Sequence, residues 1–204
     1  MSENVEEQGY PFGAELPVAA TDGEPDEELA PAVSPVHAPG DLVVPDDYGV
    51  LEGAPNGTPR GVAVVVARFN GDITTRLLDS ALAELERAGV GKAAITIVPV
   101  PGAFELPLAA MAFAKTRRYG CVVALGCVIR GETPHFDFVA GEAASGIQLA
   151  ALETGVPVSF GVLTCETAEQ AEERVDKGAE AVRTALEMAD LFAQLRTSVA
   201  AAAH

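Results

Sequence analysis

Residues 121–138 (CVVALGCVIRGETPHFDF) constrain the fold more than any other stretch of this chain. They begin with an apolar run over 121–129, which is typical of a strand buried on both faces of a parallel sheet. The run then breaks into Arg, Gly, Glu, Thr, Pro and His, and a helical pattern follows. In open α/β sheets, ligands bind just beyond the carboxyl ends of such strands. The residues after position 129 are therefore the first candidates for a functional site.

Strand and helix patterns alternate along the rest of the chain. Short apolar runs predict four strands, at 61–67, 93–98, 121–129 and 158–165. Helical spacing of apolar residues predicts helices at 72–88, 103–115, 136–153, 168–175 and 178–195. This alternation favours parallel pairing of the strands through crossover helices. We expect an α/β fold, a three-layer αβα sandwich around a four-stranded parallel sheet.

The first 59 residues differ in composition from the remainder. They hold 13 of the 30 acidic residues and nine of the 14 prolines, but no Lys or Arg. Self-repelling charge with few large apolar residues cannot offset the entropy lost on ordering. We therefore expect a disordered acidic extension over 1–59, followed by one domain over 60–198.

Charge and cysteine usage exclude several classes of function. The formal net charge is −17, whereas nucleic-acid binding depends on Lys and Arg, so no nucleic-acid partner is expected. We expect no signal peptide or membrane span, because the N-terminal residues lack a basic and an apolar region and no apolar run approaches 20 residues. Three cysteines without metal-site spacing predict reduced thiols and a cytoplasmic location.

The ends of three predicted strands carry residues suited to binding and proton transfer. The first strand leads to Phe69, the second to 101–105 and the third to 130–135. Carboxyl ends of parallel strands share one edge of the sheet, so these residues should lie together. His135 has an unperturbed pKa near neutrality and can move protons. The Thr133 hydroxyl and nearby N–H groups precede a helix, a setting that favours an anion such as phosphate.

Positive charge for a phosphate could come from Arg130 or Arg174. The chain lacks the GxxxxGK[ST] and GxGxxG patterns, so nucleotide sites of those kinds are not expected. It also lacks a GxSxG turn that would present a nucleophilic serine.

Five blocks follow one another between residues 60 and 195: ARFN (67–70), VPGAFELP (100–107), LGCVIRGETPHFD (125–137), GVPVSFGVLT (155–164) and EQA (169–171). PGAFE and GxTxH are quite specific in combination. With these blocks the chain resembles the 6,7-dimethyl-8-ribityllumazine synthase family of riboflavin biosynthesis. The family condenses 5-amino-6-(D-ribitylamino)uracil with 3,4-dihydroxy-2-butanone 4-phosphate and releases phosphate and water. The resemblance implies a flavodoxin-like arrangement and a transferase that uses no metal or organic cofactor.

The resemblance also implies a role for each matching residue. His135 is the proton-transfer residue. The substrate-binding residues are Phe69, Asn70, Gly102, Ala103, Phe104, Glu105, Val128, Ile129, Phe160 and Lys177. The phosphate-binding residues are Gly131, Glu132, Thr133 and Arg174. The family places Phe160, Arg174 and Lys177 in the neighbouring subunit of a pentamer-based homo-oligomer.

The segment from Arg174 to Lys177 is shorter than the corresponding loop of the family. This departure favours pentamers or pairs of pentamers over an icosahedral shell. Two alternative functions stay open. One is a catalytically inactive shell or scaffold protein of the same fold. The other is an archaeal-type riboflavin synthase, which would use two lumazines and need no phosphate site.

Overall fold

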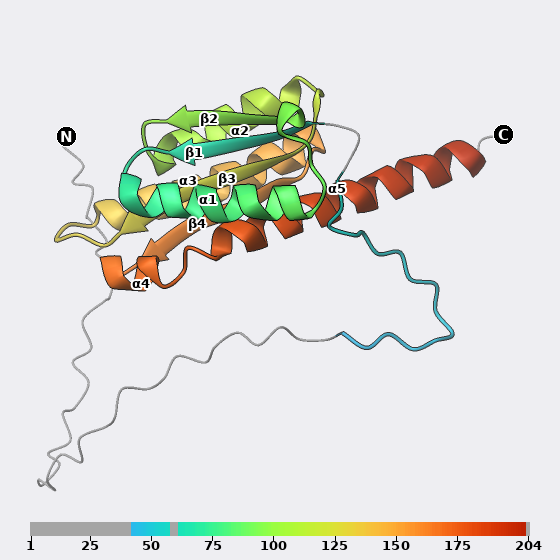
Figure 1. Ribbon diagram of the computed structural model, residues 1–204, viewed down its shortest axis with the longest axis horizontal. Coiled ribbons are helices and arrows are strands. Elements are labelled where there is room, and N and C mark those ends of the chain that lie inside the picture. The colour runs from blue at the N-terminus through green and yellow to red at the C-terminus, as the bar shows by residue number, and fades with distance from the viewer. Residues whose placement is uncertain (1–41, 58–60, 203–204) are drawn as a thin grey trace, which may run out of the picture. The chain divides into compact units, whose positions relative to one another are not determined.

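The computed structural model describes residues 42–57 and 61–202 (Figure 1). The chain divides before Asp46, and the fold described here is that of the second unit. Most of the predicted extension over 1–59 therefore lies outside the described residues. None of the helices in the described part combines the length and apolarity needed to cross a bilayer.

The centre of the domain is a four-stranded sheet in which every pairing is parallel, as the sequence predicts. Its strands are β1 (Gly61–Ala67), β2 (Ile95–Val100), β3 (Tyr119–Ile129) and β4 (Val158–Cys165). Their order across the sheet is β2-β1-β3-β4. The two inner strands, β1 and β3, carry the apolar runs that are buried on both faces.

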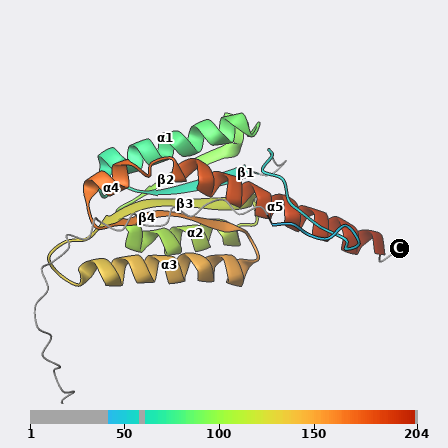
Figure 2. The same ribbon diagram turned by 90° about the horizontal axis from the view of Figure 1, so that it is seen from below.

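Helices cover both faces of the sheet, which confirms the three-layer arrangement (Figure 2). On one face lie α1 (Gly71–Arg87), the short α4 (Ala168–Glu172) and α5 (Lys177–Ala202). On the other lie α2 (Leu106–Lys115) and α3 (His135–Thr154). Alternate residues of β1 enter the two cores, since Val64 packs with α1 and α5 and Val65 with α2 and α3. The inner strands thus hold their carboxyl ends between two helical layers.

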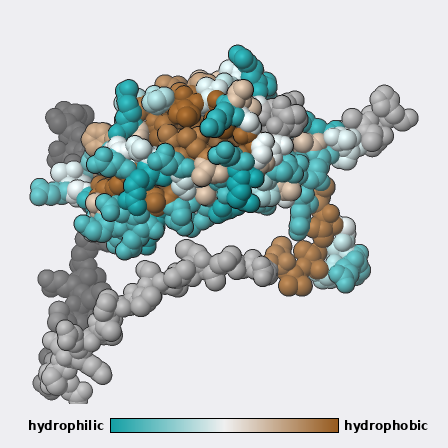
Figure 3. Space-filling view, in the orientation of Figure 1, coloured by the Kyte–Doolittle hydropathy of each residue, from teal (hydrophilic) through white to brown (hydrophobic). Residues whose placement is uncertain are grey.

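Several predicted boundaries are shifted. A 3₁₀ turn, η1 (Lys92–Ala94), precedes β2, so this strand begins at Ile95 and includes Pro99. Proline is tolerated there because β2 forms an edge of the sheet, where one side of the strand needs no ladder partner. Figure 3 shows apolar surface along this edge, where Ile97 is exposed. Helix α5 runs seven residues past the predicted end at 195 and extends beyond the sheet (Figure 1).

The last part of the predicted extension, residues 46–57, has no helix or strand but contacts the domain. The backbone N–H of Ala54 donates to Oδ2 of Asp190 at 2.9 Å, and Nε2 of Gln194 donates to the carbonyl of Glu52 at 2.8 Å. Gly57 N–H donates to the carbonyl of Ala88 at 2.7 Å. Composition alone did not predict these contacts, because they depend on groups presented by α5 and the end of α1.

Candidate active site

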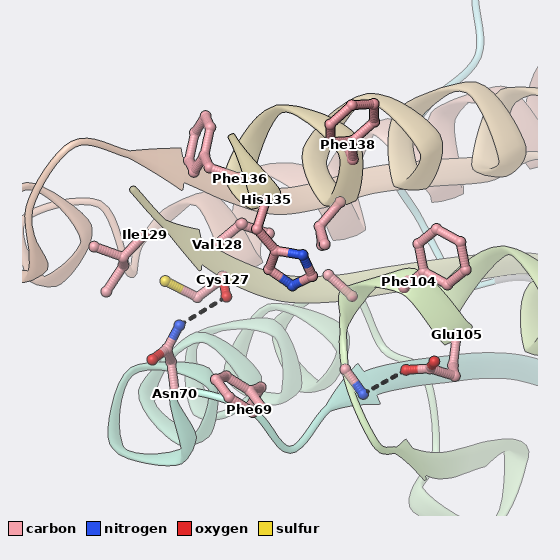
Figure 4. Close-up of a pocket in the computed structure, with 13 residues that line it drawn as sticks. Phe69, Asn70, Phe104, Glu105, Cys127, Val128, Ile129, His135, Phe136 and Phe138 are labelled. Atoms are coloured by element: carbon pink, nitrogen blue, oxygen red, sulfur yellow. Dashed lines mark hydrogen bonds between the residues drawn. The ribbon is translucent and has the colours of Figure 1, made fainter. Parts of the chain in front are cut away.

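A cavity of about 510 Å³ opens at the carboxyl edge of the sheet, next to the ends of β1 and β3 (Figure 4). It is lined by Phe69, Asn70, Gly102, Ala103, Phe104, Glu105, Cys127, Val128, Ile129, His135, Phe136, Phe138 and Val139. Nine of these were expected at a site from the sequence. The parallel topology brings them together, since they follow β1, β2 and β3 or lie at the end of β3.

Phe69 and Asn70 form the turn between β1 and α1. Asn70 adopts a left-handed backbone with φ of 55°, a conformation that asparagine tolerates better than most residues. Its Nδ2 donates to the carbonyl of Cys127 at 2.9 Å, which ties this turn to the end of β3 (Figure 4). Phe69 is 71% exposed, so its ring presents an uncovered apolar face at the cavity.

The second wall of the cavity is a 3₁₀ turn, η2 (Ala103–Glu105), between β2 and α2. Oε2 of Glu105 accepts a hydrogen bond from the backbone N–H of Gly102 at 2.9 Å, which closes the turn on itself (Figure 4). No described residue donates a hydrogen bond to the other carboxylate oxygen of Glu105. That oxygen is available to accept hydrogen bonds from a hydroxylated ligand.

His135 is the first residue of α3, and its imidazole points into the cavity (Figure 4). No described residue hydrogen-bonds to the imidazole, so both of its nitrogens are free to exchange protons with a ligand. The preceding residues Gly131, Glu132 and Thr133 are exposed and adjoin the cavity in sequence, but they are not part of its lining.

Arg130 does not supply a free positive charge to this region. Its guanidinium contacts the carboxylates of Asp137 and Glu166, at 3.0 Å and 2.8 Å for the closest pairs. The hydrogen bonds that Arg130 donates to Asp137, and then to Glu166, raise the pKa of Arg130. The hydrogen bond from Arg130 in turn lowers the pKa of Asp137. Because two carboxylates already neutralise Arg130, Arg174 is the better candidate of the two for a phosphate ligand.

Three expected site residues lie away from the cavity in this single chain. Phe160 on β4 is 46% exposed and borders, with Lys177, a separate hollow of about 80 Å³. Nη1 of Arg174 donates to the carbonyl of Gln170 at 2.7 Å and lies 3.6 Å from Oε2 of Glu173. These residues therefore do not join His135 within one subunit.

Four lining residues were not among the residues expected from the sequence: Cys127, Phe136, Phe138 and Val139. Phe138 and Val139 lie three and four positions after His135, so helical spacing would have placed them on the same face of α3. Burial, with a further contribution from Cys165, raises the pKa of Cys127 to about 11. Its thiol therefore stays neutral near pH 7 and contributes apolar surface rather than a nucleophile.

An open parallel α/β sheet with an aromatic cavity and a histidine at its carboxyl edge is the arrangement typical of α/β enzymes that bind small molecules. A family model described as 6,7-dimethyl-8-ribityllumazine synthase matches residues 60–193. The 6,7-dimethyl-8-ribityllumazine synthase of Yersinia pestis (strain Pestoides F) is 50% identical over 153 residues, which cover 72% of this chain and 98% of the relative. The synthase of Yersinia pseudotuberculosis (serotype O:1b, strain IP 31758) matches with the same identity and coverage.

The chain therefore belongs to the 6,7-dimethyl-8-ribityllumazine synthase family, which confirms the resemblance found in its sequence blocks.

Proposed function

We propose that this protein condenses 5-amino-6-(D-ribitylamino)uracil with 3,4-dihydroxy-2-butanone 4-phosphate to 6,7-dimethyl-8-ribityllumazine, releasing phosphate and water. The observation that carries the proposal is the cavity at the carboxyl edge, which gathers nine residues expected from the family pattern. Membership of the synthase family gives the reaction its chemical identity. No observation on the described residues favours an inactive scaffold protein or an archaeal-type riboflavin synthase.

The pyrimidine and its ribityl chain occupy the cavity between the turn at Phe69 and η2. The exposed ring of Phe69 stacks on the pyrimidine, since aromatic surfaces bind planar rings at little conformational cost. The end of β3 at Val128 and Ile129 supplies backbone groups to the edge of the ring. The free oxygen of Glu105 accepts hydrogen bonds from ribityl hydroxyls. Asn70 helps to keep these walls in register through its hydrogen bond to β3.

His135 transfers protons during the reaction. Imine formation, phosphate elimination and ring closure each move protons, and an imidazole is suited to this near neutral pH. The absence of a hydrogen-bond partner among the described residues leaves the imidazole able to contact the substrates. Holding both substrates in attack geometry contributes several kcal/mol more, on the order of 7–11 in favourable cases.

The phosphate group binds beside Gly131, Glu132 and Thr133, where backbone N–H groups and a hydroxyl precede α3. Arg174 supplies the positive charge, and it comes from a neighbouring subunit together with Phe160 and Lys177. This arrangement is supported by the separation of these three residues from the cavity within one chain. A metal or organic cofactor is not required by these groups.

The protein acts as a homo-oligomer built from pentamers, with a decamer or an icosahedral shell as larger possibilities. Exposed apolar side chains on the neighbouring helices α2 and α3 are consistent with the association, because apolar surface of this kind can serve as an interaction site. Leu108 on α2 is 76% exposed and Leu152 on α3 is 75% exposed. The cytoplasmic location stays a prediction, based on cysteine usage in the sequence.

Turnover of the purified protein tests the function. Both substrates are supplied together with a chelator, and lumazine fluorescence is followed at several concentrations of each. Saturable formation of the lumazine above the uncatalysed rate supports the proposal. Formation of riboflavin from the lumazine alone would favour the riboflavin synthase, and no turnover of either kind would favour the scaffold protein.

Mixing two variants that are each impaired in turnover tests the shared site. His135→Ala and Arg174→Ala are each purified, dissociated and reassembled together, and mass measurement verifies mixed assemblies. A boundary that combines an intact His135 with an intact Arg174 from the other chain should raise activity above that of either variant alone. Two samples of the same variant, treated identically, serve as the control. Mixed assemblies without recovered activity would show that both residues serve one subunit's pocket.

A further inference from the structure

Arg130 joins three segments of the chain that meet at the edge of the cavity. It is the first residue after β3, and its backbone N–H donates to the carbonyl of Cys165 at the end of β4 at 3.0 Å. Its Nε lies 3.1 Å from Oε1 and 2.8 Å from Oε2 of Glu166, which follows β4. Its terminal nitrogens donate to both carboxylate oxygens of Asp137 in the first turn of α3, at 3.0 Å and 3.2 Å.

The aromatic ring next to His135 takes part in the same arrangement. The guanidinium carbon of Arg130 lies 4.1 Å from the centre of the Phe136 ring, within the range of a cation–π contact. One side chain, that of Arg130, therefore contacts both residues that come directly after His135, namely Phe136 and Asp137. The imidazole of His135 itself has no hydrogen-bond partner among the described residues, so its position depends on the helix start that carries it.

We propose that Arg130, together with Asp137 and Glu166, is a positioning clamp that fixes the start of α3 and thereby the place of His135 in the cavity. The proposal rests on the proposed function, because it assigns a positioning role for that reaction. The planar guanidinium pairs with a carboxylate through two parallel hydrogen bonds, a geometry that lysine cannot reproduce. The pairs are exposed, so their main effect is on geometry rather than on stability.

The size of the effect follows from the sensitivity of catalysis to position. A misplacement of about 1 Å can cost roughly 100-fold in rate. We expect Arg130→Met to lower kcat by about 10- to 100-fold and to change KM for either substrate by less than about threefold. Asp137→Asn should act in the same direction, and Arg130→Lys should recover only part of the loss. The double variant should be no slower than Arg130→Met alone, because both changes remove one interaction.

The matched control is Arg76→Met. Arg76 on α1 also forms an exposed ion pair, with Glu172 at 3.8 Å, but neither residue lines the cavity. This variant should keep the parental kcat. If Arg130 is a clamp, kcat falls in the Arg130 and Asp137 variants only. If Arg130 is instead a phosphate ligand, KM for the butanone phosphate rises in the Arg130 variants and does not rise in Asp137→Asn. The second result, or a parental kcat for Arg130→Met, would overturn the proposal.

Hydrogen exchange tests, independently of turnover, whether Arg130 fixes the start of α3. Peptides that cover residues 130–138 should exchange faster in Arg130→Met and Asp137→Asn than in the parental protein and in Arg76→Met. Unchanged exchange in this segment would overturn the clamp even if kcat falls. If the parental protein forms no lumazine, the proposed function fails, and the exchange measurement still decides whether Arg130 fixes the start of α3.

Discussion

Substitution of Gly178 by alanine is expected to destabilise the protein through a backbone collision. Gly178 is the second residue of α5, where this helix crosses α1. A Cβ atom at this position would lie 2.1 Å from the carbonyl oxygen of Leu77 and 3.2 Å from the backbone nitrogen of Ala81. Both atoms belong to the backbone of α1, so no side-chain rotation can relieve the contact.

The cost can be estimated from the required displacement. Non-bonded heavy atoms settle at about 3.5 Å, so the two helices must separate by more than roughly 1 Å. Such a shift disturbs a tight junction, in which Leu77 is fully buried and Ala179 N–H donates to Oγ of Ser80 at 3.2 Å. Overpacking of this kind costs about 1–3 kcal/mol. For a chain of this size, that corresponds to a fall in melting temperature of roughly 2–12 °C.

The assay is thermal unfolding of Gly178→Ala, with Gly141→Ala as the matched control. Gly141 lies in the middle of α3, and a Cβ atom there would meet nothing within 4 Å. The control should melt at or slightly above the parental temperature, since alanine favours a helix over glycine by up to about 1 kcal/mol. A Gly178→Ala protein that melts within a degree of the parental protein would refute the packing described for α1 and α5.

Three further predictions concern the site and the N-terminal segment. His135→Ala should keep the fold and slow lumazine formation by roughly 10- to 10⁴-fold in steady-state assays, and an unchanged rate would remove His135 from proton transfer. Deletion of residues 1–45 should leave the melting temperature unchanged. Deletion of residues 1–57 should lower the melting temperature by about 2–8 °C, because contacts with α5 are lost. Equal melting temperatures of the two truncated proteins would contradict this. Hydrogen bonds from the Ala54 N–H, and then from Gln194, lower the pKa of Asp190 in the folded protein. The stability that these bonds contribute is complete at a pH above the unfolded-state pKa of about 3.9, and it is lost as the pH falls through the lower folded-state pKa. Hydrogen exchange of the Ala54 amide should accelerate over that acid range by more than the intrinsic effect of pH. If the amide stays protected in Asp190→Ala, a group other than Asp190 holds it.

The central fold could be predicted from the sequence because local pattern and tertiary burial agree there. The apolar runs of β1 and β3 are buried on both faces, as their composition requires. The limits of β2 were predicted less well, since Pro99 reads as a strand breaker unless the strand is known to form an edge. The contacts of residues 46–57 with α5 were not visible either, because they join groups far apart in the sequence.

The candidate site was predictable where it depends on strand ends. Phe69, Glu105 and His135 follow different strands, and the parallel topology brings them to one cavity. The ion pairs of Arg130 were not predictable, because its partner Glu166 lies 36 residues away, directly after another strand. A sequence pattern shows that an arginine is present but does not show whether carboxylates already neutralise its charge.

We propose that the lumazine forms in the cavity at the carboxyl edge of the sheet. The most direct test is a crystal structure of the assembled protein with 6,7-dimethyl-8-ribityllumazine bound. We expect the pteridine ring against Phe69, the ribityl chain along η2 with a hydroxyl near Glu105, and the imidazole of His135 facing the newly formed ring. Residues from a neighbouring subunit should close the open side. A lumazine bound elsewhere, with this cavity unoccupied, would show that the reaction does not take place here.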